Sequence, residues 1–136
     1  MEFNVIATFD NNCERVLMCK RRKNPYKGLY NFVGGKIEDG ESGLNAAYRE
    51  LEEETGIYKT DIILTHLMDF TYYISDIRIE VYVGRLNKDV TVCGDENDLE
   101  WLEINQNFFD LAKFAGEGNI GHIMEQIYLY KEILLK

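Results

Sequence analysis

An amphipathic helical pattern in the middle of the chain is the feature that most limits the possible folds. The apolar positions that recur with helical spacing are Leu44, Ala47, Tyr48, Leu51 and Thr55. Ser42 is a suitable N-cap and Gly56 suits the residue just past the C-terminal end, so we expect a helix of about three to four turns. A helix with one apolar face must bury that face against another element, which limits the chain to layered folds.

Strand-like stretches precede this helix. Residues from about Phe3 to Phe9 and from Arg15 to Lys20 are rich in β-branched and apolar types, and the polar segment 10–12 between them predicts a hairpin turn. A polar, basic loop from Arg21 to Tyr30 follows and leads through Phe32 and Val33 to a glycine pair. We therefore predict two antiparallel strands before the helix.

More strands and further helices follow the central helix. The segments from Ile62 to Tyr73 and from Ile77 to Arg85 predict a second hairpin that turns at Ser75 and Asp76. A short strand is expected at 99–102, a short helix from Asn105 to Phe114, and a longer amphipathic helix from Ile120 to Leu134. This order excludes a regular βαβ repeat. It predicts an α/β sandwich, with a mixed, mainly antiparallel sheet, in a single domain over residues 1–136.

Charge and composition exclude several classes of function. The formal net charge of -9 and the pI near 4.7 oppose binding to a nucleic-acid polymer, which needs Lys and Arg to neutralise phosphates. Three cysteines without a Cys-x-x-Cys pair predict neither a disulfide framework nor a thiolate zinc site. We find no signal-peptide pattern and no membrane-spanning apolar run, so we expect a cytoplasmic protein with no membrane partner.

Three glutamates are crowded on one face of the central helix. Glu50, Glu53 and Glu54 stand at i, i+3 and i+4, so their carboxylates lie next to each other. Each like-charge pair costs about 0.2 to 0.5 kcal/mol, and carboxylates near a helix C-terminus also oppose its dipole. A hard divalent cation such as Mg²⁺ would offset this cost because it prefers oxygen ligands. The alternative is an ordinary solvated acidic face.

A longer pattern around these glutamates favours the metal site. It reads Gly35, five residues, Glu41, seven residues, then Arg49-Glu50-Leu51-Glu52-Glu53-Glu54-Thr55-Gly56-Ile57. This 23-residue segment resembles the Nudix box at every fixed position, with Leu51 and Ile57 at its aliphatic places. The resemblance implies an α/β/α sandwich around a mixed sheet.

The resemblance also implies roles for individual residues. Glu50 and Glu54 would ligate the principal metal ion, Glu53 would support it or a second ion, and the Gly35 carbonyl would complete the site. The cofactor would be Mg²⁺, with Mn²⁺ as a possible substitute. Arg49 is a permanently charged fork that can hold a carboxylate through two hydrogen bonds, so we expect it to orient a box glutamate, either Glu41 or Glu53. A surface salt bridge is the alternative for Arg49. The predicted catalytic residues within the box are Glu53, Glu50 and Arg49.

A further carboxylate is expected from a loop before a late strand. Family members usually supply one there, and here Asp95 and Glu96 precede the strand at 99–102. We predict Glu96, then Asp95, as a metal ligand or as the acceptor of a proton from the attacking water. An ordinary acidic loop is the alternative. The basic residues at 21–23 and Lys27 either steer a polyphosphate into the site or balance local charge.

The segment before the box suggests which substrate is bound. Residues 27–36 resemble the corresponding segment of Nudix enzymes that act on oxidised purine triphosphates, except that Tyr30 replaces a common Trp and Val33 a common Pro. Asn31 and Asn119 each combine a donor with an acceptor, which suits the edge of a purine. The remaining predicted substrate-binding residues, which would contact the base or the phosphates, are Phe32, Gly34 and Lys36.

Together these features predict a magnesium-dependent hydrolase of phosphoanhydride bonds. The leading expectation is hydrolysis of a nucleoside triphosphate, such as 8-oxo-dGTP, to the monophosphate and pyrophosphate, which would clean the nucleotide pool. One alternative is a hydrolase of another nucleoside diphosphate-linked compound such as ADP-ribose, and another is a non-catalytic module that senses a nucleotide. Such a module would be expected to lose its box carboxylates, which are all present here. The chain is expected to act as a monomer or a homodimer.

Overall fold

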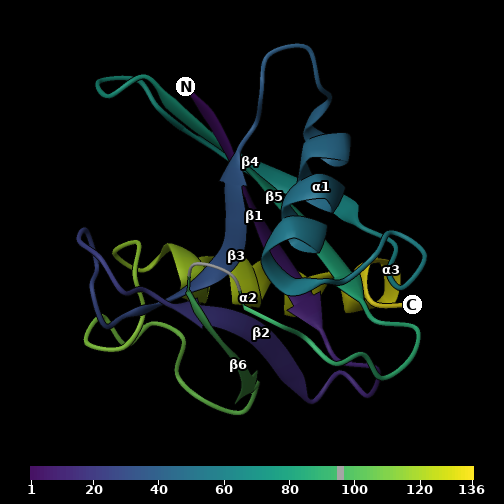
Figure 1. Ribbon diagram of the computed structural model, residues 1–136. Helices are drawn as coiled ribbons and strands as arrows, with labels where there is room; N and C mark the ends of the chain where they lie inside the picture. The colour runs from purple at the N-terminus through teal and green to yellow at the C-terminus, as the bar shows by residue number, and fades with distance from the viewer. Residues whose placement is uncertain (95–96) are drawn as a thin grey trace.

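A six-stranded mixed sheet forms the centre of the molecule in the computed structural model, which describes residues 1–94 and 97–136 (Figure 1). The strand order is β4-β5-β1-β3-β2-β6. The strands are β1 (Glu2–Phe9), β2 (Arg15–Lys20), β3 (Tyr30–Lys36), β4 (Thr65–Tyr72), β5 (Ile77–Arg85) and β6 (Asp98–Glu103). Among the strands that the structure describes, β1 and β5 are the only two that pair in parallel, so the sheet is mixed and mainly antiparallel, as predicted.

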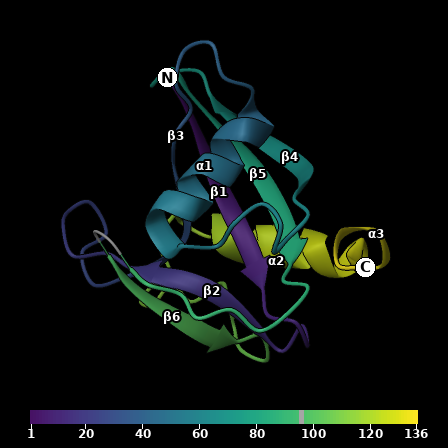
Figure 2. The same ribbon diagram turned by 45° about the vertical axis from the view of Figure 1, so that its right-hand side comes forward.

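Helices cover both faces of this sheet. Helix α1 (Gly43–Thr55) lies in front of the sheet in Figure 2, and α2 (Asn119–Leu129) lies behind it. Each helix has its own apolar cluster: Leu51 of α1 packs with Ile6 and Val33, and Ile127 of α2 belongs to the cluster on the opposite face. The predicted α/β/α sandwich is therefore confirmed.

Both ends of α1 are specified by neighbouring residues in the sequence. The Ser42 hydroxyl oxygen accepts a hydrogen bond from the Asn45 N–H at 3.1 Å, which satisfies one free donor at the helix N-terminus. Gly56 has φ +79° and donates its N–H to the carbonyl of Glu52, which is a left-handed C-terminal cap. The predicted caps are confirmed, and they place the last turn of α1, with its glutamates, beside the end of β3.

The first predicted hairpin differs from the observed topology. The two strands β1 and β2 pair only at Phe9 and Val16, next to the turn, and then diverge. Strand β3 lies between them and pairs with both, so that Gly35 stands opposite Asn4 of β1. This insertion brings the glycine pair of β3 into the middle of the sheet.

The predicted short helix from Asn105 to Phe114 is wrong, because this segment forms turns. The Asn107 and Asp110 side chains accept hydrogen bonds from the N–H groups of Phe109 and Ala112, so the side chains compete with a helical hydrogen-bond ladder. The predicted final helix is divided into α2 and a short α3 (Lys131–Leu134), with Tyr130 at φ −116° between them.

Shortening Leu51 is expected to destabilise the protein strongly. Its side chain is fully buried under α1, so Leu51→Ala should lower the free energy of unfolding by about 2 to 5 kcal/mol. Urea unfolding followed by circular dichroism measures the change. Leu44→Ala is the control because Leu44 lies on the same helix and is 41% exposed, so its loss should be below about 1 kcal/mol. Equal losses in both variants would contradict the assigned packing of α1.

Candidate functional site

Arg49 is the centre of a hydrogen-bond network on α1. Its guanidinium donates to both carboxylate oxygens of Glu41, from Nε at 3.1 Å and from Nη2 at 2.5 Å. Nη1 donates to Glu50 at 3.0 Å and to Glu53 at 3.3 Å, and Nη2 also donates to the backbone carbonyl of Lys36 at 3.1 Å. Hydrogen bonding to Arg49 lowers the pKa of Glu41 from its ordinary value. The sequence left Glu41 and Glu53 as alternative partners of Arg49, and in the structure Arg49 contacts both.

Glu50 is the most enclosed carboxylate of this group. Its side chain is 12% exposed, and its burial raises its pKa, while the neighbouring Arg49 opposes that rise. The carboxylate lies directly against Gly35 of β3, where an added Cβ would be 2.5 Å from the Glu50 carboxyl carbon. Glycine is required at this position because any side chain would displace Glu50. The Gly35 backbone and the Glu50 carboxylate therefore lie side by side. A backbone carbonyl together with a carboxylate would be a donor set that suits a hard divalent cation.

Asn4 lies next to Gly35, and the sequence analysis did not identify it as part of the site. It is 2% exposed, and its Oδ1 accepts the Gly35 N–H at 3.0 Å, which helps to fix the Gly35 peptide. Its Nδ2 atom is buried without a hydrogen-bond partner among the described residues. Asn4 stands between apolar residues, Phe3 on one side and Val5 and Ile6 on the other, and an amide in such a stretch of a strand was the available signal.

A cleft opens beside the glycine pair, and several of the predicted residues line it. Its wall includes Gly34, Gly35, Lys36 and Glu54, together with Arg21 from the basic loop. Arg22, the next basic residue of that loop, pairs through its guanidinium with the Asp98 carboxylate. The structure therefore brings one basic residue from that loop to the same cleft as the glutamate helix.

A second cavity of about 280 Å³ lies between the sheet and the start of α2. Asn31, Phe32 and Asn119, all predicted to bind substrate, line it. Asn31 and Phe32 also line the cleft beside the glycine pair, as do Val5 and Ile79. The two hollows are thus adjacent, and these four residues contribute to the wall of both.

Two residues of the predicted site cannot be placed. Asp95 and Glu96, proposed as a further ligand or proton acceptor, lie outside the described residues. Asn97, which follows them, lines the cleft next to Glu54.

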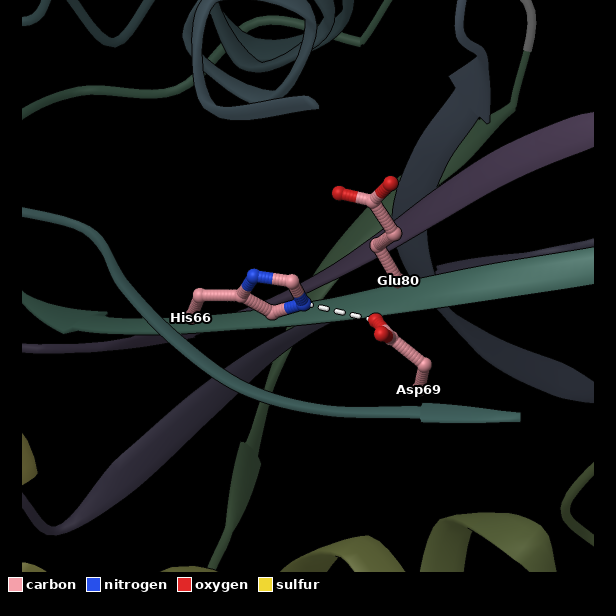
Figure 3. Close-up of side chains that lie close together, drawn as sticks. All are labelled: His66, Asp69 and Glu80. Carbon is pink, nitrogen blue, oxygen red and sulfur yellow. Dashed lines mark hydrogen bonds and ion pairs between the residues drawn. The ribbon is translucent and has the colours of Figure 1, made fainter. Parts of the chain in front are cut away.

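A second group of possible metal ligands is formed by His66, Asp69 and Glu80 on β4 and β5 (Figure 3). The His66 Nε2 atom is 2.6 Å from an Asp69 carboxylate oxygen. Arg78 donates to both carboxylates, at 2.8 Å to Asp69 and 2.7 Å to Glu80, and the Tyr82 hydroxyl donates to the other Glu80 oxygen. These side chains already neutralise and hydrogen-bond one another, so the group is explained as an ion-pair network.

Replacing Arg49 with Lys is expected to lower catalytic turnover by about tenfold to a hundredfold, the range typical of residues that orient metal ligands. Lys keeps the positive charge but cannot reach Glu41, Glu50 and Glu53 together through a planar fork. Steady-state rates at saturating Mg²⁺ measure the effect. A variant with the wild-type rate would show that Arg49 contributes charge alone.

Comparisons with known proteins show which family the chain belongs to. A family model described as the NUDIX domain matches residues 2–124. The chain is 44% identical over 43 residues to an ADP-ribose pyrophosphatase of Methanocaldococcus jannaschii, covering 32% of this chain and 25% of that protein. It is 41% identical over 46 residues to a putative 8-oxo-dGTP diphosphatase of Bacillus subtilis, covering 34% and 29%. The chain thus spans less than a third of these two relatives.

The fold is also similar to that of solved structures. A Caenorhabditis elegans Ap4A hydrolase in a binary complex superposes with a TM-score of 0.76 at 16% identity, and the match covers 96% of this chain and 97% of that one. Among the described residues, no helix is both long and apolar enough to cross a membrane. Since the family model covers nearly the whole chain, this protein belongs to the Nudix family.

Proposed function

We propose that this protein is a magnesium-dependent Nudix pyrophosphohydrolase that converts a nucleoside triphosphate to the monophosphate and pyrophosphate, with 8-oxo-dGTP as the leading candidate. The observation that carries the proposal is that the two hollows lie side by side and share four lining residues. Glu54 and Gly35 line one end, Asn119 lines the other, and Asn31 and Phe32 line both. A nucleotide likewise has two different ends, with anionic phosphates at one end and a flat base at the other.

The phosphate end combines acidic and basic groups. Gly35 through its carbonyl, with Glu50, Glu53 and Glu54, would hold Mg²⁺, and the bound ion would offset charge on the phosphate oxygens and orient the reacting groups. Arg21 and Lys36 line the same cleft, where positive charge favours a polyphosphate. Arg49 keeps Glu50 and Glu53 in position through its two Nη1 hydrogen bonds.

Hydrolysis requires a group that takes a proton from the attacking water. Glu53 is well placed to contact a water molecule, because 57% of its side chain is exposed, against 12% for Glu50. Its carboxylate accepts a hydrogen bond of 3.3 Å from Arg49. We assign this role to Glu53, with Glu96 as the other candidate from the sequence.

ADP-ribose is the second candidate substrate. The relative from M. jannaschii is named an ADP-ribose pyrophosphatase, whereas the relative from B. subtilis is named a putative 8-oxo-dGTP diphosphatase. Both substrates contain a purine and a phosphoanhydride bond, so the two adjacent hollows suit either class.

A substrate panel tests the proposal. The purified protein is incubated with 8-oxo-dGTP, dGTP, dATP, ADP-ribose and Ap4A in the presence of Mg²⁺, and released pyrophosphate and monophosphate are quantified. We expect the highest kcat/KM for a triphosphate, with pyrophosphate as a product, and loss of activity when EDTA removes the ion. Preference for ADP-ribose would replace the triphosphate assignment, and inactivity on all five compounds with Mg²⁺ or Mn²⁺ would contradict the proposed enzyme.

A further inference from the structure

The cavity between the sheet and α2 has apolar walls and a polar rim. Its walls include Phe32, Phe70, Ile79, Ile120 and Ile123. Its rim carries Tyr26, Asn31, Tyr72, Glu117 and Asn119. A flat apolar ring with polar atoms on its edge matches this division, because the ring faces contact the walls and the edge meets the rim.

Two rim residues, Tyr26 and Glu117, have an uncommon backbone conformation and are joined by a hydrogen bond. Tyr26 has φ +66° and Glu117 has φ +51°, and both therefore lie in the left-handed region that side chains other than glycine rarely adopt. They are 91 positions apart in the sequence, and the Tyr26 hydroxyl donates to Glu117 Oε1 at 2.5 Å. Such conformations persist where surrounding contacts hold them, and they are enriched at ligand sites.

The hydrogen bonds at the rim leave two acceptor atoms open. Glu117 receives the Tyr26 hydroxyl on Oε1, and no described residue donates to its Oε2. The Asn119 Nδ2 atom donates to the Tyr72 hydroxyl. The Asn119 Oδ1 atom takes no part in that bond, and no described residue donates to it. Glu117 and Asn119 are separated only by Gly118, so the two acceptors belong to one short segment at the start of α2.

Neighbouring acceptors require neighbouring donors on the ligand. The edge of guanine presents N1–H and the N2 amino group side by side, and the edge of 8-oxoguanine presents the same pair. Adenine instead places the N1 lone pair beside its N6 amino group, and a lone pair facing a carboxylate is repelled and left without a partner. The rim therefore favours guanine over adenine.

We propose that Glu117, held in position by Tyr26, is the residue that selects a guanine-type base in this cavity. The inference deepens the proposed function and rests on it, since it identifies the base of the nucleotide whose phosphates occupy the neighbouring cleft. It also distinguishes the candidate substrates, because ADP-ribose and Ap4A carry adenine.

Binding of nucleoside monophosphates tests the selection without any turnover. Isothermal titration with dGMP and with dAMP, in buffer without divalent metal, compares the two bases while the phosphate is the same. We expect dGMP to bind the wild-type protein at least about tenfold more tightly than dAMP, which corresponds to one well-formed additional base contact. In Glu117→Gln the amide can donate to adenine N1 while it accepts from N6, so the preference should disappear or reverse.

Matched variants separate selection from simple loss of charge. Glu125→Gln removes the same charge from an exposed position on α2 outside this cavity, and it should keep the guanine preference. Tyr26→Phe removes the hydroxyl that orients Glu117 and should reduce the preference by about threefold, because Glu117 keeps its charge and both acceptor oxygens but loses one orienting contact.

The outcomes distinguish this proposal from the proposed function. Equal binding of dGMP and dAMP by the wild-type protein, or a guanine preference that survives Glu117→Gln, would overturn the assignment of Glu117. Inactivity in the substrate panel, together with a Glu117-dependent preference for dGMP, would remove the enzymatic proposal and leave the base selection standing. Circular dichroism of each variant shows whether it is folded, so a lost preference in a folded variant supports the proposal.

Discussion

Glu53→Gln is expected to lower kcat by at least about a hundredfold while the fold stays intact. A positioned acid or base typically contributes about 10² to 10⁴ to the rate, and Gln keeps the shape of Glu without its charge or basicity. The Glu53 side chain is 57% exposed and makes one hydrogen bond, at 3.3 Å to Arg49, so its loss should change the free energy of unfolding by less than about 0.5 kcal/mol. Initial rates at saturating Mg²⁺ and thermal unfolding provide the two measurements.

Glu52→Gln is the matched control for this variant. Glu52 is exposed on the same helix, and the change removes the same charge. Glu52 stands outside the i, i+3, i+4 face formed by Glu50, Glu53 and Glu54. We expect it to retain wild-type turnover. Unchanged turnover in Glu53→Gln would refute the role assigned to Glu53, and equal losses in both variants would attribute the effect to the general negative field of α1.

Gly35→Ala is expected to weaken binding of divalent metal by about tenfold to a hundredfold, the range seen when the support of a metal ligand is lost. The added Cβ would be 2.5 Å from the Glu50 carboxyl carbon, so the carboxylate must move away from Gly35. The clash involves the far end of a side chain, and the stability of the sheet should therefore change little. Titration with Mn²⁺, followed by its electron paramagnetic resonance signal, measures the affinity.

Gly34→Ala provides a contrast at the adjacent position. There the added Cβ would be 2.1 Å from the backbone carbonyl oxygen of Asn4, which cannot move without disturbing the pairing of β1 and β3. We expect Gly34→Ala to lower the free energy of unfolding by about 2 kcal/mol or more, because overpacking a strand pair forces backbone shifts. Unchanged Mn²⁺ affinity in Gly35→Ala would contradict the proposed contact between the metal, Gly35 and Glu50.

Local sequence rules predicted the central helix correctly and failed near the C-terminus. Ser42 and Gly56 mark the two ends of α1 because caps depend on hydrogen bonds within a few residues. The segment from Asn105 to Phe114 has a similar apolar pattern, but there the Asn107 and Asp110 side chains bond to nearby N–H groups and stabilise turns. Periodicity alone does not distinguish these two results, since both depend on which hydrogen bonds the backbone finally makes.

The candidate site divides in the same way. The spacing of Glu50, Glu53 and Glu54 places them on one helical face whatever the rest of the chain does, so the acidic group could be recognised from the sequence. The contact between Glu50 and Gly35 depends on β3 entering the sheet between β1 and β2, and no local pattern specifies that insertion.

Long-range pairing also created the features that the sequence reading missed. Asn4 meets Gly35 across two strands, and Tyr26 meets Glu117 across 91 positions of the chain. Helix ends and side-chain faces follow from interactions between near neighbours, which a single sequence displays directly. Strand order and the convergence of distant loops follow from burying apolar surface on both faces of one sheet, which is a property of the whole chain.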